Sequence, residues 1–412
     1  MKRVLHDTAP CSPLRERYGK EISRCVKCGS CRAVCPPSIA ERSESLSARG
    51  RMALIKAVIE GRLPFSSRVK DRLASCTSCL ACEAACPSNV PVTEIIGAAK
   101  EEAVRESGHG VVNQIVASSL KSDVAMRFLA WLAPFVLHYP GGSIQGKGLG
   151  PGRGWRPGSE FVANEKARGR VALFPGCAIS HFQQDIGRSA ITVLSAIGYE
   201  VIVPEGLKCC GRPLLSLGDR KNAEELALYN STLLSRLEVD AVVTACASCG
   251  LTFKREYPKL LPPGMKTPRM HDIHEVMHRG LSGKALGAVQ KTVTFHDPCH
   301  LGRGQGLSGA AREVLRSLPG LMLVEMKNAD RCCGFGGVMR ITHGGLSNAI
   351  AADKAAMIMQ TGASAVVTGC PGCRMQITEA LRRAGSHIEV VHTVQIVEET
   401  LTRAERRARA AG

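Results

Sequence analysis

The sequence is short of aromatic residues and contains no long apolar run, and each shortage excludes a class of protein. Aromatic residues make up only 4% of the 412 residues, too few for a protein that stacks nucleic-acid bases on aromatic platforms. Because no apolar stretch follows the first residues, we expect no secretory signal and a cytoplasmic, reducing location. The 44% of hydrophobic residues are enough to form a core, and the length suggests two or three domains.

Cysteine, by contrast, is abundant. The chain has 19 cysteines, which in a reducing compartment are expected to bind metal rather than to form disulfides. Nine lie in residues 1–110 and ten in residues 177–373, with none between. The glycine-rich residues 141–154 separate the two groups and are typical of a linker. Cys11 belongs to no motif, and we expect it to be a free thiol.

The first group contains two copies of the bacterial ferredoxin motif, Cys-x-x-Cys-x-x-Cys-x-x-x-Cys-Pro. Three cysteines of one run bind one [4Fe-4S] cube, and the fourth, which precedes proline, reaches the other cube. Structural zinc is the alternative, but it usually takes two well-separated cysteine pairs. The helical pattern over residues 52–59 indicates a helix-rich ferredoxin. The sequence therefore predicts two [4Fe-4S] cubane clusters, one held by Cys25, Cys28, Cys31 and Cys86 and the other by Cys76, Cys79, Cys82 and Cys35.

The second group repeats itself. One order of cysteines, a single Cys, then Cys-Cys-Gly, then Cys-x-x-Cys, occurs twice with offsets of 122 to 124 residues. The two sets are Cys177, Cys209, Cys210, Cys246 and Cys249, followed by Cys299, Cys332, Cys333, Cys370 and Cys373.

Short apolar runs and helical spacing alternate through both repeats. The runs predict strands at 171–174, 201–203, 241–243, 293–295, 321–324 and 365–367. Helical spacing predicts helices at 185–197, 222–237 and 348–360. This alternation predicts a parallel sheet covered by helices in each repeat. Because the cysteines follow strands, we expect them to gather in the crevice at the carboxyl ends of those strands.

Each repeat brings five cysteines, although a cube needs four. Adjacent cysteines such as Cys209 and Cys210 cannot easily point both side chains at one corner of a regular cube, so an irregular cluster or a spare thiol is implied. With this motif and the paired ferredoxin runs, the sequence resembles the CCG-domain family of iron–sulfur oxidoreductases over nearly its whole length. The resemblance implies one or two further [4Fe-4S] clusters in the repeats, of the noncubane type that members with reductase activity use to cleave a disulfide.

The resemblance also implies a function and a partner. Similar chains are the iron–sulfur subunits of glycolate oxidase, lactate-utilising oxidases and anaerobic glycerol-3-phosphate dehydrogenase, which take electrons from a separate FAD protein and pass them toward quinone or another carrier. No Gly-x-Gly-x-x-Gly follows a predicted strand, so the FAD-binding dehydrogenase must be another subunit. The alternative is a heterodisulfide reductase-like catalytic subunit, and the intact Cys-x-x-Cys pairs keep it open.

We therefore expect a multidomain chain. Its parts would be a helical ferredoxin domain (1–110), a helix and Gly-rich linker (111–165), a first CCG repeat (166–285) and a second CCG repeat (286–412). Residues 126–137 hold three aromatics and are too short to span a bilayer. They could dock on a membrane or quinone-reducing subunit at the cytoplasmic face of the inner membrane, or pack across the domain junction.

Two further features leave alternatives open. The net charge of +18 suits an acidic partner, a membrane surface or compensation of anionic clusters, and we expect no nucleic-acid partner. His296, Asp297 and His300 flank Cys299 and could relay protons or tune a cluster by hydrogen bonding. A purely structural role for these three residues is equally open.

Overall fold

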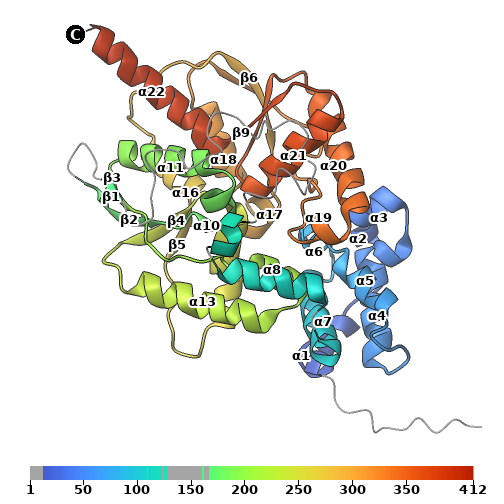
Figure 1. Cartoon of the computed structure of the whole chain (residues 1–412). Coiled ribbons are helices and arrows are strands. Elements are labelled where there is room, and N and C mark those ends of the chain that lie inside the picture. Colours follow the sequence, from blue (N-terminus) through green and yellow to red (C-terminus); the bar gives the residue numbers. More distant parts are fainter. Residues whose placement is uncertain (1–12, 109, 123, 129–159, 162–166, 412) are drawn as a thin grey trace, which may run out of the picture.

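The structure is a computed structural model that describes residues 13–108, 110–122, 124–128, 160–161 and 167–411. Cys11, the expected linker over 141–154 and most of the expected docking segment over 126–137 lie outside the described residues. Figure 1 shows a helical N-terminal part, in blue, packed beside two α/β units, in green to yellow and in orange to red. Within the described ranges, no helix combines the length and the apolar character needed to cross a membrane.

The N-terminal part is helical, as the sequence predicts. Its core surrounds α7 (Val92–Ser107), whose Ile95, Ile96 and Ala99 are buried against α1 and α4 because apolar residues at this spacing form one helical face. Helix α4 contains the predicted segment 52–59. The other elements are α1 (Pro13–Ser23), α2 (Ser30–Val34), α3 (Pro36–Glu41), η1 (Glu44–Leu46), α4 (Ala48–Ile59), α5 (Ser67–Ala74), α6 (Ala81–Ala84) and α8 (Val111–Lys121).

The first repeat is built on a sheet of order β1-β3-β2-β4-β5, in which β2 to β5 are parallel and β1 pairs antiparallel at the edge. Its strands are β1 (Glu160–Phe161), β2 (Gly169–Leu173), β3 (Tyr199–Ile202), β4 (Ala241–Thr244) and β5 (Met270–Asp272). Its helices are α10 (Gly176–His181), α11 (Gln184–Ile197), α12 (Arg212–Leu217), α13 (Arg220–Ser235), α14 (Ala247–Leu251), the π-helical turn η2 (Thr252–Glu256), α15 (Tyr257–Leu260) and α16 (Ile273–Gly280).

The second repeat has the same strand order without the antiparallel edge, β7-β6-β8-β9, and all of its strand pairs are parallel. Its strands are β6 (Lys291–His296), β7 (Leu321–Val324), β8 (Ala365–Thr368) and β9 (Glu389–His392). Its helices are α17 (Gly302–Gln305), α18 (Ser308–Arg316), α19 (Met339–Thr342), α20 (Gly344–Met359), α21 (Pro371–Arg383) and α22 (Thr393–Ala411). The six predicted strands and three predicted repeat helices are confirmed, each within a few residues of its expected ends.

The two sheets meet at the carboxyl ends of their strands. His274, which follows β5, shares a hydrogen bond through Nε2 with Thr393 Oγ1 at 3.0 Å, just after β9. An ion pair of 2.8 Å joins Arg374 of α21 to Asp185 of α11, and α11 packs along α22. In doubly wound sheets this end of the strands holds the ligand. The two candidate crevices therefore face each other inside the molecule.

Candidate metal centres

The two ferredoxin motifs form matching loops. In the first loop Lys27 and Gly29 have φ of 56° and 89°, and in the second loop the equivalent Ser78 and Leu80 have φ of 52° and 64°. Left-handed backbone is costly for a residue other than glycine and persists where the surroundings fix it. Alternating left-handed residues turn each loop tightly, so that its first three cysteines face one centre.

The structure places the fourth cysteine of the first run beside the second run. Cys35 begins α3 and lies close enough to Cys76 and Cys79 for their charges to act on its thiol. Cys82 in turn has Cys76, Cys79 and Cys35 as neighbours. This arrangement is the one that crossed ligation requires. Cys31 has Cys25 and Cys28 as neighbours, and Cys86 packs against the same hydrophobic core as Cys25 and Cys31.

Arg51 supports this centre, and the sequence analysis missed it. The side chain is only 1% exposed. Its Nη1 donates to Cys35 Sγ at 3.8 Å, its Nε to the Arg72 carbonyl at 2.6 Å and its Nη2 to Ser75 Oγ at 2.8 Å. A buried cation beside thiolates offsets their charge and fixes one ligand loop. Its position one turn before Ile55, on the apolar face of α4, is the signal that could have found it.

The five cysteines of the first repeat form a connected group of thiols. Cys209 donates to Cys177 Sγ at 3.6 Å. Cys210 lies near enough to Cys209 and Cys249, and Cys249 to Cys246, for these thiols to shift one another's pKa. Cys209 and Cys210 stand at the end of the loop after β3, which Gly211 closes at φ 87°. All five thiols are therefore near enough to address one centre.

The second repeat has the same connectivity. Cys333 and Cys373 share a hydrogen bond with their sulfur atoms 3.4 Å apart. Cys332 lies near enough to Cys299 and Cys333, and Cys373 to Cys370, for these thiols to shift one another's pKa. All but Cys299 are in the buried class. The expectation that each set converges on one crevice agrees with this arrangement.

Close approaches between thiols also join the groups to one another. Cys246 of the first repeat lies near enough to Cys370 of the second for each thiol to shift the other's pKa, and Cys79 of the ferredoxin part packs against Cys332. We call this series of cysteines the thiol row. It starts at Cys79 in the second ferredoxin loop, passes through the second repeat from Cys332 to Cys370, and ends in the first repeat, which it enters at Cys246. The ferredoxin part therefore reaches the first repeat's thiols by way of the second repeat.

Two residues of the second repeat hold the ferredoxin loop against it. Arg303 donates from Nε to the Cys79 carbonyl at 3.0 Å and from Nη2 to the Asp330 carbonyl at 2.7 Å, while Nη1 pairs with Asp330 Oδ2 at 2.6 Å. His300 donates from Nε2 to the Ser78 carbonyl at 3.1 Å, so its Nδ1 accepts from Ser248 Oγ at 2.9 Å. Burial lowers the pKa of His300 to about 4, which keeps this imidazole neutral in the metal-free chain.

The two carboxylate oxygens of Asp297 differ in their hydrogen bonding. Its Oδ2 accepts from Ser308 Oγ and from Arg312 Nη1, the latter at 2.9 Å. Oδ1 is buried and has no partner among the residues that the structure describes. Asp297, Arg303 and Arg312 line a hollow of about 580 Å³ beside Cys299. Solvent therefore approaches the second repeat's site from this side.

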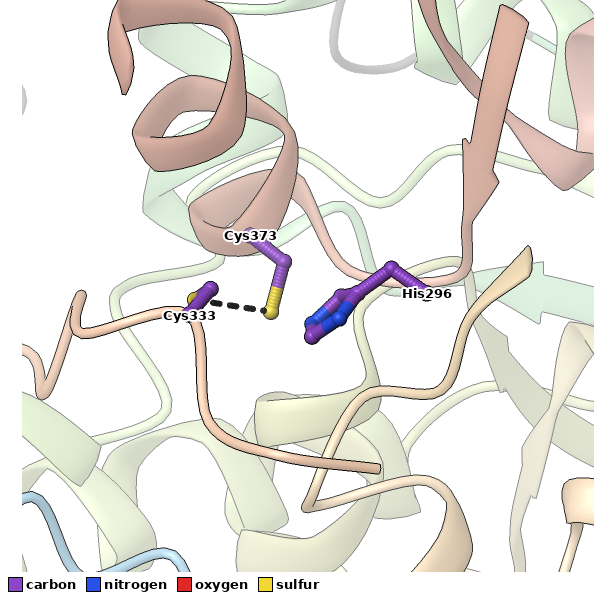
Figure 2. A group of neighbouring side chains, drawn as sticks. All are labelled: His296, Cys333 and Cys373. Atoms are coloured by element: carbon purple, nitrogen blue, oxygen red, sulfur yellow. Dashed lines mark hydrogen bonds between the residues drawn. The ribbon is translucent and has the colours of Figure 1, made fainter. Parts of the chain in front are cut away.

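His296, at the end of β6, is the residue whose role the sequence could not decide. It is 1% exposed, and neither of its ring nitrogens has a hydrogen-bond partner in the described part of the chain. A ring nitrogen and the sulfur atoms of Cys333 and Cys373 all lie within 4.8 Å of one another. Figure 2 shows the imidazole extending from the strand toward the two sulfur atoms. Burial lowers the pKa of His296 to about 3.

The protonation of the metal-free thiols varies along the row. Hydrogen bonding to Cys332 and burial raise the pKa of Cys79 well above its usual value. Hydrogen bonds from Cys246 and then Cys373 hold the pKa of Cys370 well below its usual value. Because thiolates are the metal ligands, metal binding must release protons from the thiols whose pKa is raised.

The fold and these groups of buried, mutually close thiols define an iron–sulfur electron-transfer protein. The sequence profile of the CCG cysteine-rich domain matches residues 171–254 and 293–378, and that of the 4Fe-4S dicluster domain matches residues 21–90. The chain belongs to the CCG-domain family of iron–sulfur oxidoreductases. It is one component of an oxidoreductase, as the names of its relatives also indicate.

Relatives match most of the chain. An uncharacterized iron–sulfur protein of Methanococcus maripaludis is 32% identical over 88% of this chain and 69% of its own length. A probable glycolate oxidase iron–sulfur subunit of Bacillus subtilis (26% identical) and a subunit of the dihydromethanophenazine:CoB–CoM heterodisulfide reductase of Methanosarcina barkeri (27%) each match 92% of this chain and 94% of their own length. The crystal structure of a hypothetical protein from Helicobacter pylori has a similar fold, with a TM-score of 0.51 at 10% identity over 94% of this chain and 75% of that one.

Proposed function

We propose that this chain relays electrons along the thiol row, between the second ferredoxin centre and the centres of the two repeats. The packing of the buried Cys79 against the buried Cys332 is the observation that carries this proposal. It places a predicted ligand of one centre against a predicted ligand of the next, so that no other side chain separates them. Iron–sulfur clusters supply one-electron transfer when bound, and the residues described above hold the two ligand loops together.

The ligand sets support two cubane clusters in the ferredoxin part and one cluster in each repeat. Five connected thiols exceed what a cube binds, so we infer a noncubane cluster in at least one repeat. The Gly334 carbonyl accepts from Ser347 Oγ at 2.8 Å, and Cys332 Sγ accepts from Gly334 N–H at 3.4 Å. The Cys-Cys-Gly loop is thus fixed from both sides before any metal binds, which fits a site where adjacent cysteines must both face inward.

The relay needs a source and a destination for its electrons. We infer an FAD-binding dehydrogenase subunit as the source, acting on glycolate, D-lactate or glycerol 3-phosphate, with quinone or another carrier as the acceptor. The likeness to a glycolate oxidase iron–sulfur subunit over nearly the full length of both chains supports this choice. The complex would be cytoplasmic, with peripheral attachment to a membrane or quinone-reducing subunit.

Disulfide reduction is the second candidate, and one observation favours it. Cys246 and Cys370 are both buried and lie near enough across the junction of the repeats to shift each other's pKa, so the two complete five-cysteine sites face each other rather than solvent. A disulfide placed between two such sites would meet a one-electron donor on each side. The likeness to a heterodisulfide reductase subunit agrees with this arrangement.

Anaerobic purification of the native complex separates the two candidates. Co-purification of an FAD protein, with reduction of this chain by glycolate, lactate or glycerol 3-phosphate, supports the dehydrogenase relay. Reduction of a disulfide by the pre-reduced chain, in the absence of glycolate, lactate and glycerol 3-phosphate, supports the reductase. If Cys332→Ser leaves electron transfer from the ferredoxin centres to the repeats at the wild-type rate, the relay along the thiol row is wrong.

A further inference from the structure

The two repeats hold their cysteines alike but surround them with different residues. The position three residues before the first cysteine of each set is Phe174 in the first repeat and His296 in the second. Phe174 is buried and packs edge to face on Phe253, with ring centroids 4.8 Å apart. The apolar phenyl ring of the first repeat is therefore replaced by an imidazole in the second repeat.

A second difference lies on the helix after the Cys-Cys-Gly loop. Asn230 of α13 and Lys354 of α20 are equivalent, 124 residues apart, and both donate to backbone carbonyls of the loop that carries the adjacent cysteines. Asn230 Nδ2 donates to the Cys209 carbonyl at 3.0 Å. Lys354 Nζ donates to the Asn328 carbonyl at 2.8 Å and to the Ala329 carbonyl at 3.3 Å. A neutral amide in the first repeat is thus a buried amine in the second.

Both replacements act in the same direction on a bound cluster. An imidazole carries at least one N–H in either protonation state, and hydrogen bonds to cluster sulfur raise a cluster's reduction potential. A nearby ammonium favours the more anionic, reduced form by simple Coulomb attraction. Phe174 and Asn230 offer neither effect. Both repeats contact the ferredoxin part, and the second is the one whose cysteine Cys332 packs against the ferredoxin cysteine Cys79.

We propose that His296 and Lys354 raise the reduction potential of a cluster held in the second repeat, His296 through an N–H hydrogen bond to a cluster sulfur and Lys354 through its positive charge. The second repeat is then reduced before the first by electrons from the ferredoxin part, and onward transfer to the first repeat is uphill in free energy. This inference rests on the proposed occupancy of the second repeat and concerns only its tuning.

The test is an EPR-monitored redox titration of the full chain, purified anaerobically, with the residues of the first repeat as matched replacements. His296→Phe and Lys354→Asn should each lower the midpoint potential of one cluster signal and leave the ferredoxin signals in place. At a fixed solution potential we expect the reduced-to-oxidised ratio of that cluster to fall about tenfold in each variant. Unchanged midpoints with iron content intact would overturn the proposal.

A conservative variant and measurements on the wild-type protein sharpen the test. His296→Asn retains an N–H and should keep a higher midpoint than His296→Phe; equal midpoints would contradict the hydrogen bond. In wild-type protein labelled with 15N-histidine, pulsed EPR should show the weak nitrogen coupling of a hydrogen-bonded imidazole, and the strong coupling of an iron-bound nitrogen would contradict it. Wild-type protein with no more than the eight irons of two cubanes would instead refute the proposed occupancy of the repeats.

Discussion

The two cysteine-rich repeats share a strand order and a cysteine order, yet the charges around their cysteines differ. Phe174, Asn230 and Asp272 in the first repeat stand where His296, Lys354 and His392 stand in the second. Asp272 is the acidic cap of α16, whereas His392 accepts from the Val394 N–H through Nδ1 at 3.3 Å. The cysteine framework and the backbone are alike in the two halves, and the difference lies in buried polar groups, which leave the fold unchanged while altering the site.

The two repeats also meet the ferredoxin part differently. The first repeat uses partly buried ion pairs, such as Arg255 with Glu94 at 2.8 Å, and the buried Lys100, whose Nζ donates to the Ser216 carbonyl at 2.9 Å. The second repeat uses the cluster loop itself, through Cys332, His300 and Arg303. Partly exposed ion pairs are weak and tolerant of change, and neither of these contacts involves a cysteine, whereas the contact between Cys79 and Cys332 joins predicted ligands of two centres. The second repeat is therefore the expected entry point.

The largest expected effect tests whether electrons from the ferredoxin part enter through the second repeat or through the first. Cys332→Ser removes both a predicted ligand and the contact with Cys79, and we expect iron affinity at the second repeat to fall by more than about 100-fold and the first repeat to receive no electrons. The matched Cys209→Ser should leave the second repeat's site loaded and reducible. Iron analysis and EPR of the reduced proteins measure both. If the first repeat of Cys332→Ser is still reduced through the ferredoxin part, the order of the relay is wrong.

A glycine comparison tests how tightly each Cys-Cys-Gly loop is packed. Gly211 and Gly334 both have φ of 87°, so alanine costs about 1–2 kcal/mol at either position. A Cβ on Gly334 would lie 2.6 Å from the Ser347 carbonyl oxygen, whereas one on Gly211 would find its nearest atoms, in Ala223, at 3.5 Å. We expect Gly334→Ala to cost a further ~1–3 kcal/mol in the free energy of unfolding. Equal costs in chemical denaturation would contradict the tighter second loop.

The contacts that the second repeat makes with the ferredoxin part should contribute more to stability and to electron transfer than those of the first repeat. Arg303→Ala leaves the Cys79 carbonyl without its donor, and we expect a loss of about 1–3 kcal/mol together with slower electron transfer into the repeats. Arg255→Ala removes a partly exposed ion pair and should cost about 1 kcal/mol or less. Denaturation and the rate of internal electron transfer check the pair. A variant Arg255→Ala that slows transfer as much as Arg303→Ala would point to entry through the first repeat.

The smallest expected effect is on the free energy of unfolding at acidic pH. Burial lowers the pKa of His392 to about 3 from its ordinary 6.5, so its contribution to stability is complete above pH 6.5 and is lost as the pH falls toward 3. Between pH 7.5 and 5.5 the loss is about 1.4 kcal/mol. His392→Asn keeps an acceptor for the Val394 N–H and cannot ionise in this range. The variant should therefore lose that much less stability over the interval, and an unchanged pH dependence would show that His392 is not buried as a neutral group.

The sequence was sufficient for the parts of this fold that depend on local pattern. Apolar runs located six strands, and cysteine spacing located every motif. Strands β5 (Met270–Asp272) and β9 (Glu389–His392) were missed because they are short and carry polar residues such as His271 and Glu389. β1 was missed as well, since it is a two-residue strand at the sheet edge.

The thiol row and its supporting cations could not be predicted. The contact between Cys79 and Cys332 joins residues more than 250 positions apart, and spacing carries no information about how domains dock. Arg51 and Lys354 look like ordinary charges on helices, and only packing shows that both are buried near cysteines. The chemistry of the ligands is local in sequence, whereas the order of the centres is a property of the assembled domains.

The count of iron and reactive thiols in anaerobically purified protein tests the central claim most directly. If the second repeat holds a cluster that takes part in the relay, the chain carries more than the eight irons of two cubanes. Alkylation of the iron-loaded protein then spares Cys299, Cys332, Cys333, Cys370 and Cys373 until the metal is removed. Eight irons per chain, with all ten repeat cysteines alkylated at once, would contradict the account and leave the repeats as a scaffold.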